Sequence, residues 1–379
     1  MTRPVLIAHA IYRLDFGGLE NGLVNLVNLL PADRFRHVIV CLAGYSEFRQ
    51  RIQRGDVQLL SLDKHPGKDP AAYVRMWRLL RQLRPRILHT RNLGTIDMQW
   101  VGLAAGVPIR IHGEHGWTAD DPQGVDPRNL RIRRACRPAV HRWLGMSQHI
   151  AQWLGRDVGV PPERIRQLYS GVDAQRFSPS ISPATDVPWD AHAGTVTIGT
   201  VGRLDPVKNQ ASLVQSFHRI LERYPELRGQ LRLIIAGDGP MRAELEESVE
   251  QFGIGDDVWL PGARSDVSAL MRAMDIFVLP SLNEGISNTI LEAMSSARPV
   301  VAARVGGNPE LVEHGRTGIL YQHGNDDALE AAVMQYVSNP PLRLAHGSAA
   351  RERVLAGFSI DAMVRRYADF YEELLAVRN

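Results

Sequence analysis

The sequence lacks several patterns that would assign it at once to a class of protein. Its 379 residues include only two cysteines, Cys41 and Cys136, which lie far apart and outside any Cys-x-x-Cys spacing. This excludes a disulfide framework and a cysteine zinc site, and it fits a reducing compartment. No apolar run reaches the roughly 18 residues that suggest a membrane span, and the apolar start Val5–Ala8 is too short for a signal-peptide core. We therefore expect a cytoplasmic chain without a membrane-spanning helix.

Ligand-binding fingerprints are missing as well. The chain has no Gly-x-Gly-x-x-Gly, which disfavours a dinucleotide oxidoreductase, and no Gly-x-x-x-x-Gly-Lys phosphate loop. It has no Asp-x-Asp, the paired carboxylates that commonly hold a donor diphosphate through a divalent metal. The run from His112 to His115, His-Gly-Glu-His, resembles a metal cluster, but no His-Glu-x-x-His or matching carboxylate pattern accompanies it. We expect no metal site and no cofactor.

The net charge of +3 is unevenly distributed along the chain. Residues 1–185 contain 26 Lys and Arg against 15 Asp and Glu, a net charge of +11, and the remainder has −8. The positive charge of the N-terminal half indicates an anionic partner. We do not expect this partner to be a nucleic acid. The densest stretch, 128–144, predicts a basic amphipathic helix that lies on an anionic membrane at the inner face of the cell. Alternatively, it is a solvated helix face whose apolar side packs on the protein. Its arginines are Arg128, Arg131, Arg133, Arg134, Arg137 and Arg142.

Apolar strand-like runs alternate with helix-like periodic runs through both halves of the chain, which predicts βαβ units and parallel sheets. The Pro-containing stretch 178–194 is the expected linker. We expect two Rossmann-like, doubly wound domains, 1–177 and 195–359, that face a cleft and hold ligands at the carboxyl ends of their strands. A last amphipathic helix occupies 360–379. The expected strands are Val5–Ala8, His37–Leu42, Val57–Leu60, Ile87–His89, Ile109–His112, Val196–Val201, Leu231–Ala236, Val258–Leu260, Ile276–Leu279 and Val300–Ala302.

The strongest motif spans residues 284–293, with the sequence EGISNTILEA. It follows an apolar strand and crosses a turn at Gly285 into a helix. In this arrangement Glu284 would accept hydrogen bonds from sugar hydroxyls, and Glu292 would reach ribose hydroxyls. Alternatively, Thr289 and Glu292 form a capping box that serves only the helix. The helix N-terminus can bind phosphate through its unpaired amides, here those around Ser287, Asn288 and Thr289.

Three weaker motifs also follow expected strands. Arg203 offers a planar fork and Lys208 a compact charge for a diphosphate, although both could be ordinary surface cations. The pair Gly17-Gly18 lets the backbone approach a ligand closely, although turns use such pairs freely. His115 stands before a glycine at a strand end and is a candidate for a polar contact, whereas His112 is expected to be buried.

In combination these motifs resemble the family-four retaining glycosyltransferases of the GT-B fold, and the resemblance covers nearly the whole chain. More narrowly, the chain resembles sugar transferases of bacterial exopolysaccharide assembly systems. It departs from the family at Ser170, within Tyr-Ser-Gly-Val-Asp, where the family has Asn-Gly-Val-Asp before the interdomain hinge. The matching pieces, in order, are Gly17-Gly18, Val201-Gly202-Arg203 with Lys208, Ala236-Gly237-Asp238-Gly239-Pro240, Leu260-Pro261-Gly262, 275–281, 284–292 and Gly306-Gly307-Asn308-Pro309-Glu310.

The resemblance implies a retaining, metal-independent, hexosyltransferase-like enzyme. Its donor would be a nucleotide-diphosphate sugar, a UDP-sugar ahead of a GDP-sugar. Its acceptor would be a glycan or a lipid-linked molecule in cell-surface or exopolysaccharide synthesis. The alternatives are a nucleotide-sugar epimerase or phosphorylase, or a non-catalytic nucleotide-sugar-binding subunit, on the same fold.

The resemblance also implies residue roles. Glu284 would touch the donor sugar and Glu292 the ribose, and Arg203 and Lys208 would bind the diphosphate. His115 would contact the reacting sugar. The helix at 360–379 would cross back to the N-terminal domain. The other donor-binding residues would be Gly17 and Gly18, which close over the phosphates, with Gly237, Gly239, Gly262, Gly285, Ser287, Asn288 and Thr289.

Overall fold

The computed structural model describes residues 4–117, 121–179, 186–189 and 194–377, which form two compact units. The first unit combines residues 1–170 with 360–379, and the second is 171–359. The division between Ser170 and Gly171 lies ahead of the stretch 178–194 expected as a linker. Of that stretch, 180–185 and 190–193 lie outside the described residues.

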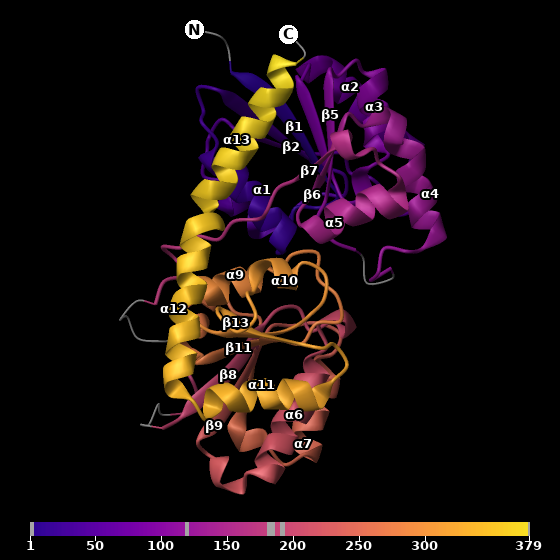
Figure 1. The fold of residues 1–379 in the computed structure, drawn as a ribbon. Helices are drawn as coiled ribbons and strands as arrows, with labels where there is room; N and C mark the ends of the chain where they lie inside the picture. Colours follow the sequence, from indigo (N-terminus) through magenta and orange to yellow (C-terminus); the bar gives the residue numbers. More distant parts are fainter. Residues whose placement is uncertain (1–3, 118–120, 180–185, 190–193, 378–379) are drawn as a thin grey trace. The chain divides into compact units, whose positions relative to one another are not determined.

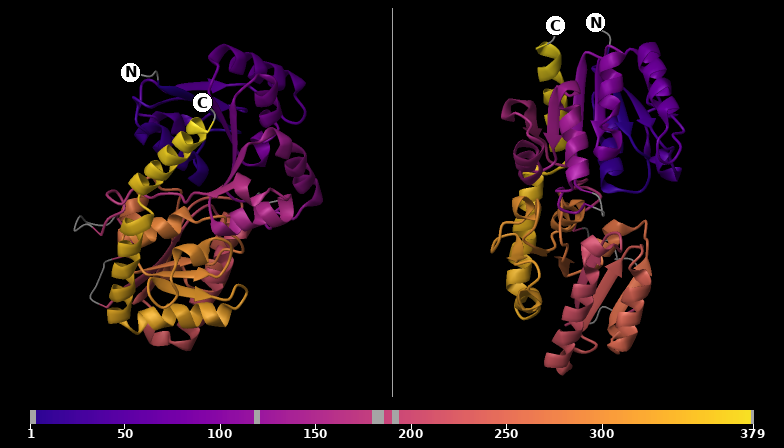
Figure 2. Two further views of the ribbon diagram at one scale, coloured as in Figure 1. Left: turned by 45° about the horizontal axis from the view of Figure 1, so that its top comes forward. Right: turned by 90° about the vertical axis from the view of Figure 1, so that its right-hand side faces the viewer.

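The first unit is built on a parallel sheet of seven strands in the order β3-β2-β1-β4-β5-β6-β7. Helices cover both faces of this sheet (Figures 1 and 2), as crossover connections between parallel strands require. The strands are β1 (Val5–Ile11), β2 (Phe35–Cys41), β3 (Gln58–Ser61), β4 (Ile87–Arg91), β5 (Ile109–Glu114), β6 (Arg142–Gly145) and β7 (Ile165–Gln167). The helices are α1 (Gly18–Leu29), α2 (Pro70–Leu83), α3 (Met98–Ala104), α4 (Pro127–Cys136), α5 (Gln148–Trp153) and α13 (Ile360–Ala376).

Both faces of this sheet are buried, which explains the largely apolar runs of β1 and β2, whereas β4 and β5 also carry polar residues that are themselves buried. Alternate residues of β1 serve opposite cores: Ala8 and Ala10 pack in the cluster under α2 and α3, whereas Ile11 packs in the cluster under α1. Helix α13 completes the unit. The ring of its Tyr371 lies 5.9 Å from that of Phe35, at the start of β2.

The second unit repeats the plan with six parallel strands in the order β10-β9-β8-β11-β12-β13. A large apolar cluster, which includes Phe217 and Tyr336, packs on one face of this sheet. The strands are β8 (Val196–Val201), β9 (Leu231–Ala236), β10 (Val258–Gly262), β11 (Ile276–Leu279), β12 (Val300–Ala303) and β13 (Gly318–Tyr321). The helices are α6 (Gln210–Arg223), α7 (Arg242–Gln251), α8 (Val267–Ala273), α9 (Asn288–Ser295), α10 (Asn308–Leu311), α11 (Asp326–Val337) and α12 (Pro340–Gly357).

Each sheet reverses its strand order at one place, between β1 and β4 in the first unit and between β8 and β11 in the second. Ligands of open α/β sheets bind beyond the carboxyl ends of the strands at such a switch point. The fold therefore points to the loops after these four strands and their neighbours.

The expected doubly wound α/β fold is confirmed, and the bounds of β8, β9 and β11 are those expected from the sequence. Strands β6, β7 and β13 were not anticipated. Within the described ranges, none of the helices has the length and apolar character needed to cross a bilayer.

The prediction of one basic amphipathic helix over 128–144 is wrong. Helix α4 ends at Cys136, a single 3-10 turn follows at Arg137–Ala139, and Arg142 begins β6. The reason is tertiary: β6 is paired on one side with β5 and on the other with β7. Arg133 does not face solvent, because it forms a buried ion pair with Glu114 (Nε–Oε1 2.6 Å).

Candidate functional site

At the carboxyl edge of the second sheet, five βα loops form one hydrogen-bonded rim. The loops after β8, β9, β10, β11 and β12 are joined pairwise by backbone hydrogen bonds. Because each loop is tied to a neighbour, the side chains on this edge have a fixed support. From donor amide to acceptor carbonyl, the bonds are Leu204 to Asp238 (2.9 Å), Gly237 to Gly262 (2.9 Å), Leu282 to Val207 (2.8 Å) and Gly307 to Glu284 (3.1 Å).

Glycines permit this close approach of loops. Gly237 and Gly306 have φ of +149° and +50°, values that other residues rarely adopt. A Cβ on Gly237 would lie 1.8 Å from the carbonyl oxygen of Gly202, and one on Gly306 would lie 1.7 Å from that of Glu284. Of the other expected glycines, Gly239 likewise presses on the β8 loop, while Gly262 and Gly285 are buried.

Lys208 and Glu284 meet on this rim. Lys208 ends a 3-10 turn, Pro206–Lys208, that Asp205 caps by accepting a hydrogen bond from the Val207 amide (3.2 Å). Its Nζ donates to Oε1 of Glu284 at 2.6 Å, and the Ser281 hydroxyl donates to the same oxygen at 2.7 Å. Glu284 is 8% exposed. A buried carboxylate is thus held by a cation and a hydroxyl, and Oε2 is left for another donor.

Arg203 lies at the same edge and is more accessible. Its guanidinium forms an ion pair with Asp205, yet its side chain is 67% exposed. Burial would raise the pKa of Asp205, but the hydrogen bonds from Arg203 and the Val207 amide lower it. Asp205 therefore stays charged and orients Arg203 while the guanidinium remains open to solvent.

Helix α9 starts beside Glu284. Ser287 is its N-cap, with the hydroxyl accepting from the Ile290 amide (3.3 Å). The alternative interpretation of Thr289 and Glu292 as a capping box is therefore wrong, because Thr289 already lies inside the helix. Glu292 stands half-buried in the second turn, and Oδ1 of Asn288 is buried with no partner among the described residues. The first amides of such a helix have no intrahelical acceptor and can bind an anion.

In the first unit, Gly18 and His115 line one small cavity of about 20 Å³, room for about one water. Gly18 begins α1, and Gly17 is its N-cap, with extended backbone. A Cβ on Gly17 would lie 2.2 Å from Oε2 of Glu20, so the Glu20 carboxylate already packs against this turn. The cavity also touches Arg91 and Ser170.

His115 is held at its backbone and free at its ring. Its amide donates to Oδ1 of Asn92 at 2.8 Å, while its Nε2 is buried and has no partner in the described part of the chain. Burial, and after it the charge of Arg91, lowers the pKa of His115 to about 3. The imidazole is therefore neutral near pH 7, and Nε2 can donate to or accept from a ligand hydroxyl, depending on the tautomer.

Arg91 is a site residue that sequence reasoning missed. It ends β4, is 3% exposed, and contacts imidazole nitrogens rather than a carboxylate: Nδ1 of His9 at 3.3 Å and Nδ1 of His89 at 3.4 Å. His89 Nδ1 also contacts the hydroxyl of Tyr371, on α13, at 2.9 Å. The available signal was the position of this arginine at the carboxyl end of a strand. Ser281 was missed likewise, although it lies two residues after the end of β11.

The His-Gly-Glu-His run does not form a metal site. His112 is buried, with its Nδ1 2.7 Å from Oγ1 of Thr90 and its Nε2 3.2 Å from Oε1 of Glu114. Burial would raise the pKa of Glu114, but Arg133 and His112 bring it to about 2. Within the described ranges, no group of three or more His, Cys, Asp or Glu side chains is placed to hold a metal ion.

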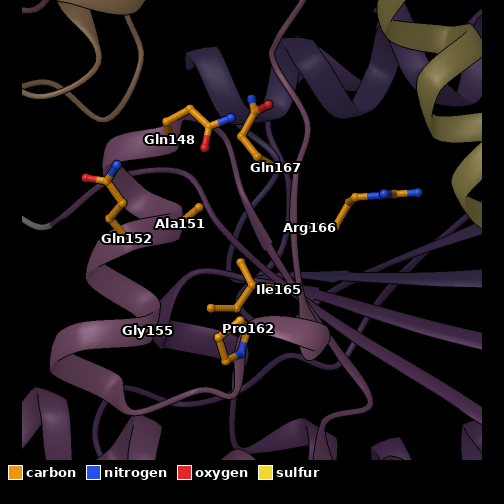
Figure 3. A pocket seen from close by; sticks show the side chains of 8 residues that line it. All are labelled: Gln148, Ala151, Gln152, Gly155, Pro162, Ile165, Arg166 and Gln167. Carbon is orange, nitrogen blue, oxygen red and sulfur yellow. The ribbon is translucent and has the colours of Figure 1, made fainter.

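A larger groove of about 530 Å³ lies beside edge strand β7 (Figure 3). Three glutamine side chains line it, together with the apolar Ile165 and Pro162, and Nε2 of Gln167 is buried without a partner in the described structure. None of the residues expected from the sequence lines this groove. Its glutamines are Gln148, Gln152 and Gln167.

Solved structures with this architecture identify the class. HepE from Anabaena, solved in complex with UDP and glucose, superimposes with a TM-score of 0.80 at 19% identity, covering 97% of this chain and 99% of that chain. Two parallel doubly wound sheets with this match define a glycosyltransferase fold of the GT-B type.

Sequence relatives give the family. The model described as "Glycosyltransferase Family 4" matches residues 16–176, and "Glycosyl transferases group 1" matches 195–339. The D-inositol 3-phosphate glycosyltransferase of Thermobispora bispora is 30% identical, over 70% of this chain and 69% of that protein. The Escherichia coli UDP-Gal:alpha-D-GlcNAc-diphosphoundecaprenol alpha-1,3-galactosyltransferase is 24% identical, over 98% and 97% respectively. The chain belongs to the family-four, group 1 glycosyltransferases, enzymes that use nucleotide-diphosphate sugars as donors.

The structure thus distributes the expected residues over two groups. In the second unit it brings Lys208 and Glu284 into contact, with Arg203 and the start of α9 on the same edge. In the first unit it brings Gly18 and His115 to one cavity. Both groups follow the strands at which the sheet order reverses, or their direct neighbours.

Proposed function

We propose that this chain transfers a sugar from a UDP-sugar to a glycan or lipid-linked acceptor in cell-surface or exopolysaccharide synthesis, with retention of the anomeric configuration and without a metal ion. The observation that carries the proposal is the contact of Lys208 with Glu284 at the switch point of the second sheet. At this edge the cation can bind the diphosphate of a nucleotide sugar, and the carboxylate can accept hydrogen bonds from the sugar hydroxyls.

The donor roles follow from the charges. The diphosphate gains negative charge as the sugar leaves, and Lys208, Arg203 and the α9 amides are fixed positive groups that stabilise it. Oε2 of Glu284 would accept from a sugar hydroxyl. Glu292, one turn into the same helix, would bind the ribose. These groups would stand in for a divalent metal.

The acceptor side is assigned to the first unit. His115 offers, beside Gly18, a ring nitrogen that has no partner among the described residues, and the imidazole is neutral, which suits a hydrogen bond to a hydroxyl. In a front-face route the donor phosphate takes the acceptor proton, so no protein base is required. A lipid-linked acceptor is supported by the Escherichia coli relative, whose name gives a diphosphoundecaprenol acceptor and a UDP-sugar donor.

Thermal unfolding with nucleotides tests the donor assignment. UDP, GDP, ADP and their sugar conjugates would be added in EDTA and in Mg²⁺. Saturating UDP at a hundredfold excess over its dissociation constant should stabilise the fold by about 2.7 kcal/mol. Lys208→Ala should lose most of this shift. Arg219→Ala, which breaks an ion pair with Glu330 elsewhere in the same unit, should keep it.

Product analysis tests the reaction itself. An α-linked product from an α-linked donor, formed in EDTA, would support retention without a metal. A strict Mg²⁺ requirement would contradict metal independence. Turnover of the donor sugar without any acceptor would favour an epimerase, and donor binding with no turnover by a panel of acceptors would favour a non-catalytic subunit.

A further inference from the structure

One side of the first unit exposes a group of large apolar side chains. They come from three helices, α2, α3 and α4, which follow one another along this side of the unit (Figure 1). Each is between 36% and 47% exposed, although aliphatic and aromatic side chains of this size usually lie in a core. We refer to them as the aromatic face: Tyr73, Val74, Trp77, Trp100, Leu103 and Ile132.

The members of the aromatic face on α2 and α3 are adjacent. The hydroxyl of Tyr73 donates to Oδ2 of Asp97 at 2.5 Å, and Nε1 of Trp77 donates to the carbonyl of Ala104 at 3.4 Å. Trp100 lies three residues after Asp97 and four before Ala104. This spacing places it on the same side of α3, between the two contacts from α2.

Helix α4 extends the aromatic face. Burial raises the pKa of the Cys136 thiol, at the end of α4, and Trp100 lies near enough to this thiol to lower the pKa in part. Ile132 lies one turn earlier in that helix, on the same side as Cys136. The exposed residues of α2 and α3 therefore form one surface, and the end of α4 lies at its border.

The charge around this surface is positive. Residues 70–113 contain a single acidic residue, Asp97, whose carboxylate accepts a hydrogen bond from Tyr73. Of the seven arginines in this range, Arg91 and Arg110 are buried and Arg75 pairs with Asp69. Arg78 and Arg81 are exposed on α2. Arg128 and Arg131 are exposed on α4, and among the described residues none of these four arginines has an ion-pair partner.

The inward face of α2 packs against the core without any residue of the aromatic face. Ala72, Met76 and Leu80 are buried in the core at i, i+4 spacing, so Tyr73, Val74 and Trp77 are not needed for it. Trp and Tyr are enriched where one end of a side chain meets apolar lipid and the other meets water. Arginine binds phosphate with two parallel hydrogen bonds. The combination matches a phospholipid headgroup layer with negative charge.

We propose that the aromatic face, flanked by Arg78, Arg81, Arg128 and Arg131, docks the first unit onto an anionic phospholipid bilayer. Trp77 and Trp100 lie at headgroup depth, and the arginines bind lipid phosphates on either side. The inference goes beyond the proposed transfer reaction and does not depend on it. It also replaces the helix expected at 128–144, since only the first two arginines of that stretch contribute.

Vesicle flotation tests this surface. The full chain should float with phosphatidylglycerol–phosphatidylethanolamine vesicles and not with phosphatidylcholine alone. The double variant Trp77→Ser/Trp100→Ser should bind at least tenfold more weakly at every salt concentration. Arg78→Gln/Arg81→Gln should lose the preference for phosphatidylglycerol and most of the salt dependence.

Controls distinguish a lost surface from a lost fold. Leu344→Ser/Leu355→Ser removes two exposed leucines of α12, 74% and 51% exposed, and should float like the unmodified chain. Arg49→Gln removes an exposed arginine of the 3-10 turn Glu47–Arg51, where Phe48 packs in the cluster under α1 rather than in the one under α2 and α3. All variants should keep their circular dichroism and the thermal shift with nucleotide, so failure of docking is separable from failure of the donor site.

Two results would overturn the proposal. One is undiminished flotation of a folded Trp77→Ser/Trp100→Ser variant. The other is absence of flotation of the unmodified chain together with a dimer that this double variant abolishes, which would make a second copy the occupant of the aromatic face.

Discussion

The ammonium of Lys208 lies 2.6 Å from Oε1 of Glu284, and this contact joins the loops after β8 and β11, the two strands at which the second sheet reverses its order. The residues are 76 positions apart in the chain. Each fixes the other, because Lys208 neutralises a carboxylate that is almost fully buried. A substitution at either position should therefore disturb the other.

Glu284→Gln should lower kcat by about a hundredfold, because the amide keeps the shape but loses the charge that orients Lys208 and binds sugar hydroxyls. Steady-state transfer kinetics measure this, and donor affinity should change less. Glu330→Gln is the matched control, a buried glutamate of α11 that pairs with Arg219. Full activity of Glu284→Gln would show that the role assigned to Glu284 is wrong.

Gly306→Ala should destabilise the second unit and weaken donor binding. Its φ of +50° disfavours a side chain, and the new Cβ would lie 1.7 Å from the carbonyl of Glu284. Gly315→Ala has a comparable φ of +77° but open space around its Cβ. Urea unfolding should show a loss at Gly306 that exceeds that at Gly315 by about 1 kcal/mol or more. Equal losses would mean that the loop contact is not tight.

Tyr371→Phe should cost about 1–2 kcal/mol of unfolding free energy, because His89 Nδ1 loses its contact with the hydroxyl at 2.9 Å in a buried setting. Tyr367→Phe, on the same helix and also buried, should cost less, since its hydroxyl reaches only the sulfur of Met146 at 3.6 Å. Urea denaturation of both variants gives the comparison. A larger loss of unfolding free energy in Tyr367→Phe than in Tyr371→Phe would show that the hydrogen bond to His89 is not the stronger of the two contacts.

Acid should destabilise the first unit well above the titration of ordinary carboxylates. Burial and the charge of Arg54 lower the pKa of His37 to about 3, whereas an unfolded histidine titrates near 6.5. Below about pH 6.5 the unfolded chain therefore binds a proton that the folded chain does not. Stability is complete above this pH and falls as pH drops toward 3, by up to about 1.4 kcal/mol per pH unit for such a histidine.

Urea unfolding at pH 7.5, 6.5 and 5.5 measures this dependence, and His37→Gln should reduce the slope. Burial also lowers the pKa of His9, His89, His112 and His115, so the variant should retain a residual slope. A stability that stays constant between pH 7.5 and 5.5 would show that these histidines are solvated.

The sequence predicts elements well where one local pattern decides them. Strand β9 is a continuous apolar run, and the structure gives it the bounds expected. Strand β6 has a charged start and only four residues, and its arginine neighbours favour a helix. Pairing with β5 and β7 overrides that local preference, and no local pattern reveals it.

The site likewise contains residues that the sequence predicts and residues that it does not. Residues at strand ends, such as Lys208 and Glu284, can be identified from motif and position, although their direct contact cannot. Arg133 belongs by sequence to a solvated basic stretch, but Glu114 on another element draws it into the interior. Ser287, rather than Thr289, caps α9, since the choice of cap depends on the path of the loop that arrives from β11.

Helix α13 has a consequence for synthesis on the ribosome. The contact between His89 and Tyr371 cannot form until Tyr371 is synthesised, 282 residues later and after the whole second unit. Until α13 emerges, the side of the first sheet that carries Phe35 and His89 lacks its cover, whereas the second unit has all of its strands. The first unit made is therefore the last one finished, and a nascent chain stalled before residue 360 would expose that surface to chaperones and proteases.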